Sequence, residues 1–190
     1  MGVRNLTMSG LRLHLAVMTS VALLAASPLK GADPPASPAS PAWRRHTIDA
    51  ADRTSGKLGA DGVRLADINH DGRLDVATGW EQGGAIRVCL NPGPRLVRKP
   101  WPAVTVGRVR SPEDAVFGDL DRDGQFDVIS CCEGNTRQIF VHWAPSNRRR
   151  QLDPTAWTTG SIPAVAGKQA WMYALPLDID GRHGMDLLVG

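Results

Sequence analysis

The chain has 190 residues, 42% hydrophobic and 22% charged, with 20 glycines and 14 prolines. This composition is typical of a folded domain and excludes a low-complexity chain. The formal charge of +3 comes from Arg4, Arg12 and Lys30, because residues 33–190 hold 19 basic and 19 acidic side chains. A near-neutral body lacks the basic excess of a nucleic-acid binder, so we expect no nucleic-acid partner. We interpret the basic run at 148–150 as a solvated loop.

The N-terminal region predicts export. Arg4 and Arg12 precede an apolar run of 12 residues at 15–26, and small residues follow it. A membrane-spanning helix needs about 20 apolar residues, so the pattern predicts a signal peptide over residues 1–32, cleaved between 26 and 32. We therefore expect a secreted, periplasmic or cell-envelope protein with no membrane span after the signal is removed.

A spacer and a folded region follow the predicted signal. Residues 33–42 are rich in proline, alanine and serine, which predicts an extended linker before folded sequence starts near residue 43. Three cysteines are too few for a disulfide scaffold. A bridge from Cys89 to Cys131 or Cys132 and three buried free thiols are both compatible with the sequence.

A nine-residue motif occurs three times. It reads DINHDGRLD at 67–75, DLDRDGQFD at 119–127 and DIDGRHGMD at 178–186, with starts 52 and 59 residues apart. Every copy has aspartate at its first and ninth positions and an apolar residue at its second and eighth. Such recurrence indicates structural repeats.

The acids of the motif predict calcium loops. Oxygen donors at alternate positions of a tight turn can face one point, and Ca²⁺ takes six to eight oxygens at about 2.3–2.6 Å. Glycine at the sixth position permits the sharp bend. In the third copy, Arg182 and His183 replace the third acid and this glycine. The other reading is that the loops are only Asx-rich hairpin turns. The candidate ligands are Asp67, Asn69, Asp71, the Arg73 carbonyl and Asp75; Asp119, Asp121, Asp123, the Gln125 carbonyl and Asp127; and Asp178, Asp180 and Asp186.

The flanks of the loops predict strands rather than the helices of an EF-hand. The twelfth position, glutamate in an EF-hand, is Thr78, Ser130 and Val189. Alternating and β-branched residues then continue through the chain between turn signals. The expected strands are residues 62–67, 74–79, 85–90 and 103–106; 114–119, 126–131, 138–143 and 157–161; and 172–178 and 185–189.

Together, the loops and strands resemble the FG-GAP/VCBS repeats of integrin-type β-propellers. The resemblance covers residues 62–190 and rests on DxNxDGxxDV and DxDxDGxxDV, each with a strand on both sides. It implies an all-β fold of four-stranded antiparallel propeller blades, each with a Ca²⁺ loop in the hairpin between its first two strands. Residues 43–190 then form about two and a half blades, and residues 43–49 are a candidate strand for completing the last blade.

The incomplete third blade predicts further sequence. Propellers have four to eight blades that pack against their neighbours, whereas this chain reaches Gly190 inside a strand. We expect the N-terminal part of a longer secreted bacterial-type protein, or a truncated reading frame, with the remaining blades in missing C-terminal sequence.

Two functions are compatible with this reading. The favoured one is an exported, non-catalytic Ca²⁺-binding module that recognises or adheres to an extracellular protein or polysaccharide. The alternative is the N-terminal portion of an extracellular carbohydrate-active enzyme, a lyase or dehydratase built on a propeller. No histidine lies in a recognisable nucleophile motif. The tryptophans are expected to pack between blades, or, for Trp80 and Trp171, to form a sugar-stacking platform.

Overall fold

The computed structural model describes residues 43–182 and 184–190. The predicted signal peptide and linker lie outside these residues. No helix in the described ranges has the length and apolar character needed to cross a membrane.

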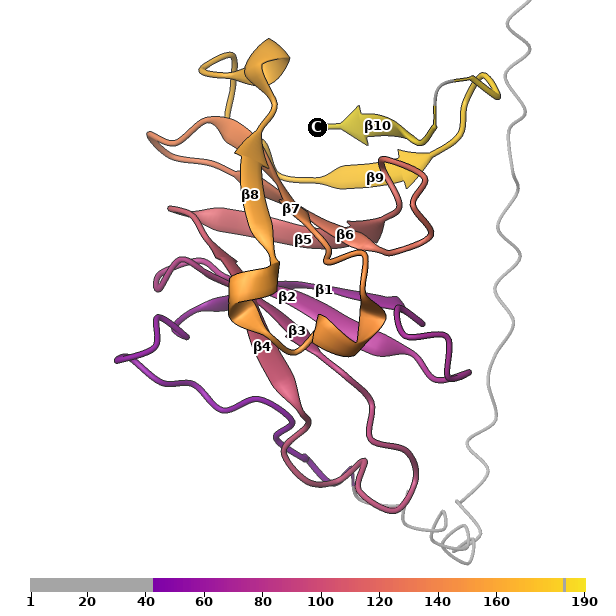
Figure 1. Ribbon diagram of the computed structural model, residues 1–190. Helices are drawn as coiled ribbons and strands as arrows, with labels where there is room; N and C mark the ends of the chain where they lie inside the picture. The colour runs from indigo at the N-terminus through magenta and orange to yellow at the C-terminus, as the bar shows by residue number, and fades with distance from the viewer. Residues whose placement is uncertain (1–42, 183) are drawn as a thin grey trace, which may run out of the picture. The chain divides into compact units, whose positions relative to one another are not determined.

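Ten strands in the described residues form three antiparallel sheets, stacked in layers (Figure 1). The first sheet contains β1 (Ala60–Ala66), β2 (Asp75–Trp80), β3 (Ala85–Cys89) and β4 (Ala103–Arg108). The second contains β5 (Pro112–Gly118), β6 (Asp127–Cys132), β7 (Gln138–Trp143) and β8 (Thr158–Ser161). The third contains β9 (Ala174–Leu177) and β10 (Asp186–Val189). Three short 3-10 turns are η1 (Arg148–Arg150), η2 (Pro154–Ala156) and η3 (Pro163–Val165).

This topology confirms the predicted fold class. Within each four-stranded sheet the strands pair in chain order, as in a propeller blade, and every pair is antiparallel. The third sheet is the first hairpin of a further blade. The structure therefore contains two four-stranded sheets and two strands of a third.

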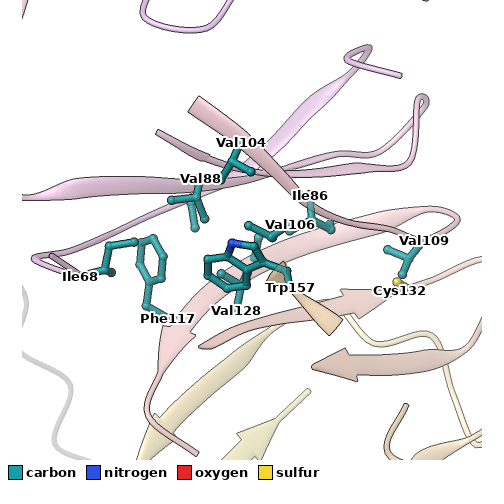
Figure 2. Packing of buried hydrophobic residues seen from close by; sticks show 12 residues of the cluster. Ile68, Ile86, Val88, Val104, Val106, Val109, Phe117, Val128, Cys132 and Trp157 are labelled. Atoms are coloured by element: carbon teal, nitrogen blue, oxygen red, sulfur yellow. The ribbon is translucent and has the colours of Figure 1, made fainter. Parts of the chain in front are cut away.

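The second sheet has a core on each face. Along β6, Val128 and Cys132 face the first sheet, whereas Ile129 and Cys131 face the third, because successive strand residues point to opposite sides. This strand is buried along its whole length. Figure 2 shows the Trp157 indole in the middle of the core between the first two sheets.

The cysteines are free thiols buried in these cores. Cys131 and Cys132 point to opposite faces of β6 and therefore cannot bridge each other. Cys89 lies on β3 of the first sheet and forms no disulfide. Of the two possibilities for the cysteines, the structure shows the buried free thiols.

The expected strand at residues 43–49 is wrong, since these residues form no strand. Instead, the segment is held by side chains and a single backbone contact. The Ile48 carbonyl accepts the Trp101 N–H at 2.8 Å. Asp49 pairs with Lys57 Nζ and Arg87 Nε, both at 2.8 Å. Although burial opposes ionisation, these two cations hold the pKa of Asp49 below its usual value.

The sugar-stacking platform is also wrong. Trp80 is 6% exposed and Trp171 is 7% exposed, which leaves neither ring face free for a sugar. Trp171 packs with Ile129 and Ile139, and its indole N–H donates to the Val165 carbonyl at 3.2 Å. Packing between blades is the role that the structure shows for this residue.

Apolar side chains are exposed on the outer faces of the stack. Val63 and Leu65 on β1 are 61% and 57% exposed, while their neighbours on the strand face the second sheet. Leu175 on β9 and Leu188 on β10 are 54% and 59% exposed. The first and third sheets thus each present an apolar strip to solvent.

Candidate functional site

Each copy of the nine-residue motif forms the hairpin loop between the first two strands of a sheet. Residues 67–74 join β1 to β2, residues 119–126 join β5 to β6, and residues 178–185 join β9 to β10. The loops project from the same side of the stack (Figure 1). The strand–loop–strand arrangement expected from the sequence is therefore correct for all three copies.

The loops follow one another along this edge. The rings of His70, in the first loop, and Phe126, in the second, lie 6.2 Å apart between centroids. Arg122 Nη2, in the second loop, lies 3.9 Å from Asp178 Oδ2 in the third. Blade stacking thus places the acidic loops side by side.

The first two loops share one hydrogen-bond pattern. The first aspartate accepts the N–H of the sixth residue, from Gly72 to Asp67 at 2.8 Å and from Gly124 to Asp119 at 3.1 Å. Both glycines have φ +82°, which explains the choice of glycine at this position. The fifth position also accepts the N–H of the seventh, at 3.0 Å in the first loop and 2.8 Å in the second.

The ninth aspartate holds the loop to the rest of its blade. Asp75 accepts the N–H groups of Ile68 at 3.1 Å and Asn91 at 2.7 Å. Asp127 accepts those of Leu120 at 3.2 Å and Ala144 at 2.9 Å. In each case one oxygen closes the loop and the other fixes the connection between the third and fourth strands. A carboxylate oxygen has a second lone pair, so this arrangement leaves it able to contact a cation.

These buried carboxylates ionise less readily than ordinary ones. Burial raises the pKa of Asp127, the N–H groups of Ala144 and Leu120 act against the rise, and the charges of Asp121 and Asp123 add to it, so that the pKa is about 6. Burial likewise raises the pKa of Asp75. A cation beside either group would favour its charged form.

The second loop has the clearest cation geometry. Asp119, Asp121 and Asp123 offer carboxylate oxygens that all lie within 4.8 Å of one another. Asp119 Oδ1 is buried and has no hydrogen-bond partner among the described residues. A buried acceptor without a donor is costly unless something else contacts it. An all-oxygen donor set with one such atom fits Ca²⁺.

The first loop satisfies its acids internally. The Arg73 guanidinium contacts the Asp71 carboxylate, and Asn69 Nδ2 donates to the same carboxylate at 3.0 Å. Both oxygens of Asp67 accept backbone N–H groups. Within the described part of the chain, the three carboxylates of this loop form no group like that of the second loop.

The third loop keeps its acids together although its sequence departs from the motif. Asp178, Asp180 and Asp186 have carboxylate oxygens within 4.8 Å of one another. Gly181 takes the fourth position with φ +72°, where the other loops have His70 and Arg122 at 57° and 62°. His183 lies outside the described residues.

Two anchoring residues were missed by sequence reasoning. Gln151 is buried, and its Nε2 donates to the Ile68 carbonyl at 3.0 Å, so the second blade supports the first loop. Asn91 starts the connection that Asp75 holds, and its Nδ2 donates to the Leu74 carbonyl at 3.2 Å. The spacing from the ninth aspartate to the residue whose N–H donates to it, 16 and 17 residues in the two blades, could have identified the second of these contacts.

A second acidic group lies at the opposite ends of the strands. Asp61, Glu81 and Glu113 have carboxylate oxygens within 4.8 Å of one another. Burial, followed by repulsion from Glu133, Asp61 and Glu81, raises the pKa of Glu113 to about 7. These residues share no sequence motif, so only the packing of β1 against β5 brings them together.

The comparisons with known proteins agree with this geometry. Residues 67–130, which span the first loop, the second loop and the strands between them, match the family model described as FG-GAP-like repeat. The chain carries FG-GAP-like repeats. It is also 27% identical to mouse integrin alpha-7 over 146 residues, which cover 67% of this chain and 12% of the integrin. Rat integrin alpha-7 gives the same identity and coverage.

The chain therefore spans only a small fraction of the curated relatives that it matches. What the likeness supports is the repeat and its propeller-blade architecture.

Proposed function

We propose that this chain is part of an exported, calcium-binding β-propeller that recognises or adheres to an extracellular ligand and catalyses no reaction. The observation that carries the proposal is the second loop, where three carboxylates converge and Asp119 Oδ1 is buried without a partner. The FG-GAP-like match over residues 67–130 supports the same assignment.

The proposed ligands are those of the three loops. In the second loop, Asp119, Asp121, Asp123, the Gln125 carbonyl and Asp127 would hold the ion. The corresponding residues in the first loop are Asp67, Asn69, Asp71, the Arg73 carbonyl and Asp75, and in the third they are Asp178, Asp180 and Asp186. A bound Ca²⁺ would offset the repulsion among these acids and fix each hairpin.

The cellular location and the ligand are also proposals. The N-terminal sequence pattern and the integrin likeness support export, to the medium or the cell envelope. A protein or a polysaccharide is the proposed ligand. We further propose that blades from additional sequence cover the exposed apolar strips of the first and third sheets, because contiguous exposed apolar surface favours association.

Ser130 and His142 are the side chains that most resemble a catalytic pair, but they do not support a catalytic role. Ser130 Oγ and His142 Nε2 lie 3.0 Å apart, a distance typical of a nucleophile and its base. However, both side chains are fully buried, so no substrate can contact them. His142 also hydrogen-bonds Thr159 Oγ1 at 2.9 Å, and burial lowers its pKa to about 4. This histidine connects strands in the core.

Thermal unfolding of the full chain with and without Ca²⁺ tests the proposal. At 100 times Kd, each site should add about 2.7 kcal/mol to the free energy of unfolding. Asp123→Asn should reduce this gain, whereas the matched control Glu81→Gln, at the other end of the strands, should keep it. If Ca²⁺ leaves the unfolding of the wild-type chain unchanged, or if both variants lose the gain equally, the calcium proposal is wrong.

A further inference from the structure

The fold gathers cations that are far apart in the sequence. His46, Arg95, Arg98 and Lys99 line a hollow of about 770 Å³ together with Pro94 and Val97. The two segments are joined by the hydrogen bond from Trp101 N–H to the Ile48 carbonyl. We call His46, Arg95, Arg98 and Lys99 the rim basic patch. Arg44 and Arg45, both exposed, immediately precede it in the chain.

The charge of this patch is uncompensated. Residues 90–102, which connect β3 to β4, contain no acid, and neither do residues 43–48. The next acid in the chain, Asp49, is already paired with Lys57 and Arg87. Across the portion of the chain that the structure covers, Arg95, Arg98 and Lys99 form no ion pair. All three are exposed, so their positive charge faces solvent.

The connection that carries the patch is held in place. Asn91, near its start, donates its N–H to Asp75 and its Nδ2 to the Leu74 carbonyl. The N–H groups of Leu96 and Val97 donate to the Gly93 carbonyl at 3.0 and 2.9 Å. The Trp101 indole then donates to the Val97 carbonyl at 2.9 Å. A loop ordered before binding loses less conformational entropy when a ligand docks.

The equivalent connection of the second blade, between β7 and β8, is also basic, but most of its cations already have partners. It carries Arg148, Arg149 and Arg150 in η1 and starts at Ala144, which Asp127 holds as Asp75 holds Asn91. However, Arg150 pairs with Asp153 at 2.7 Å, and Arg148 Nε donates to Gln125 Oε1 at 3.3 Å. Two of its three guanidinium groups are therefore already engaged.

We propose that the rim basic patch binds an anionic polysaccharide through its carboxylate or sulfate groups. Several unpaired cations on neighbouring segments attract a polyanion and release its counterions. Apart from the His46 imidazole, the residues that line the hollow offer no aromatic ring on which nucleic-acid bases could stack. The choice of a polysaccharide rests on the proposed function, because export places the patch outside the cell.

Binding of the full chain to heparin and polygalacturonate, with neutral dextran and duplex DNA as comparison polymers, tests this inference. We expect salt-sensitive binding to both anionic polysaccharides and none to dextran. The triple variant Arg95→Gln, Arg98→Gln, Lys99→Gln should bind at least about tenfold more weakly at about 0.1 M salt. The matched triple Arg148→Gln, Arg149→Gln, Arg150→Gln removes the same charge and should change affinity less than about twofold.

Each contrary result has a defined meaning. Equal losses in the two triples would show attraction by net charge alone, and tighter binding to DNA would assign a nucleic acid instead. Failure to bind either anionic polysaccharide would also overturn the inference. Calcium-dependent melting of the same variants separates this inference from the proposed function. The patch triple should keep the full Ca²⁺ effect, and a wild-type chain that binds heparin without any Ca²⁺ effect would contradict only the calcium proposal.

Discussion

The loops at 67–75 and 119–127 follow the same motif and share several internal hydrogen bonds, but they differ in how their acids are satisfied. The loops differ at the third position, Asn69 against Asp121, and at the seventh. Arg73 turns its guanidinium onto Asp71, whereas Gln125 turns its side chain away to Arg148. The second loop has Asp121 at the third position, where the first has Asn69, and therefore brings three carboxylates together. Asp119 Oδ1 is buried without a partner among the described residues, whereas the equivalent oxygen of Asp67 accepts the Asp71 N–H.

This difference shows that a match to the motif does not determine how many carboxylate oxygens a loop leaves free to contact a cation. Both loops supply the backbone frame, because aspartate and glycine at fixed spacing form it locally. The arrangement of the carboxylates depends on whether the third residue is aspartate or asparagine, and on whether the side chain of the seventh residue contacts the fifth. We therefore infer that the second loop binds Ca²⁺ more tightly than the first.

The largest change in stability is expected for Asp127, which holds the second loop to its blade, and not for the other acids of that loop. Asp127→Ala leaves the buried N–H groups of Leu120 and Ala144 without acceptors, so it should lower the free energy of unfolding by about 4 kcal/mol even in chelator. Asp121→Ala, at an exposed position, should cost less than about 1 kcal/mol. Urea unfolding in EDTA measures both. Similar losses for the two variants would mean that Asp127 does not brace the loop.

A second effect extends the comparison to the cores of the two blades. Val76 pairs with Cys89 in the first sheet, and Val128 pairs with His142 in the second, so the thiol and the imidazole occupy equivalent positions. Burial raises the pKa of Cys89 to about 11 and lowers that of His142 to about 4. Only the second blade therefore contains a core group that gains charge in mild acid.

The direction in which stability changes with pH follows from the pKa of His142 in the folded and in the unfolded chain. The unfolded chain, with a histidine pKa near 6.5, binds more protons than the folded chain between about pH 6.5 and 4. The contribution of His142 to stability is complete above about pH 6.5, falls with falling pH, and has lost about 3 kcal/mol near pH 4. His142→Gln should remove this part of the pH dependence in urea unfolding. An unchanged slope would contradict a neutral buried imidazole.

The smallest expected effect tests the seventh position itself. Arg73→Gln frees Asp71 from an exposed ion pair worth less than about 1 kcal/mol, so the Ca²⁺ affinity of the first loop should rise by no more than about fivefold. Arg110→Gln, which removes a charge from an exposed position near the other strand ends, is the control. Calorimetric titration measures the change. A weaker first site in Arg73→Gln would mean that Arg73 supports the loop.

The strands and loops could be predicted from the sequence because their causes are local. Period-two alternation and Asp–Gly turns located all ten strands to within a few residues. The segment at 43–49 was predicted as a strand because the propeller resemblance offered it a place in the last blade, but its main contacts are side-chain ion pairs of Asp49 with distant residues. Such contacts carry no local pattern.

Two further features, one basic patch and the burial of two tryptophans, could be recognised only in the folded structure. Counting charge along the chain indicated a neutral body, yet folding brings His46 beside Arg95, Arg98 and Lys99 while the acids collect in the loops and near Glu113. Similarly, Trp80 and Trp171 lie near strand ends in the sequence, where exposure is plausible, but packing between layers buries them. Both features depend on distances between residues that are remote in the chain.

Calcium titration of the full chain by isothermal calorimetry, compared with Asp119→Asn and Asp67→Asn, tests the central claim most directly. We expect saturable calcium binding to the wild-type chain, loss of its tightest site in Asp119→Asn, and retention of that site in Asp67→Asn. Absence of calcium binding in the wild-type chain, or loss of the tightest site in Asp67→Asn alone, would contradict it.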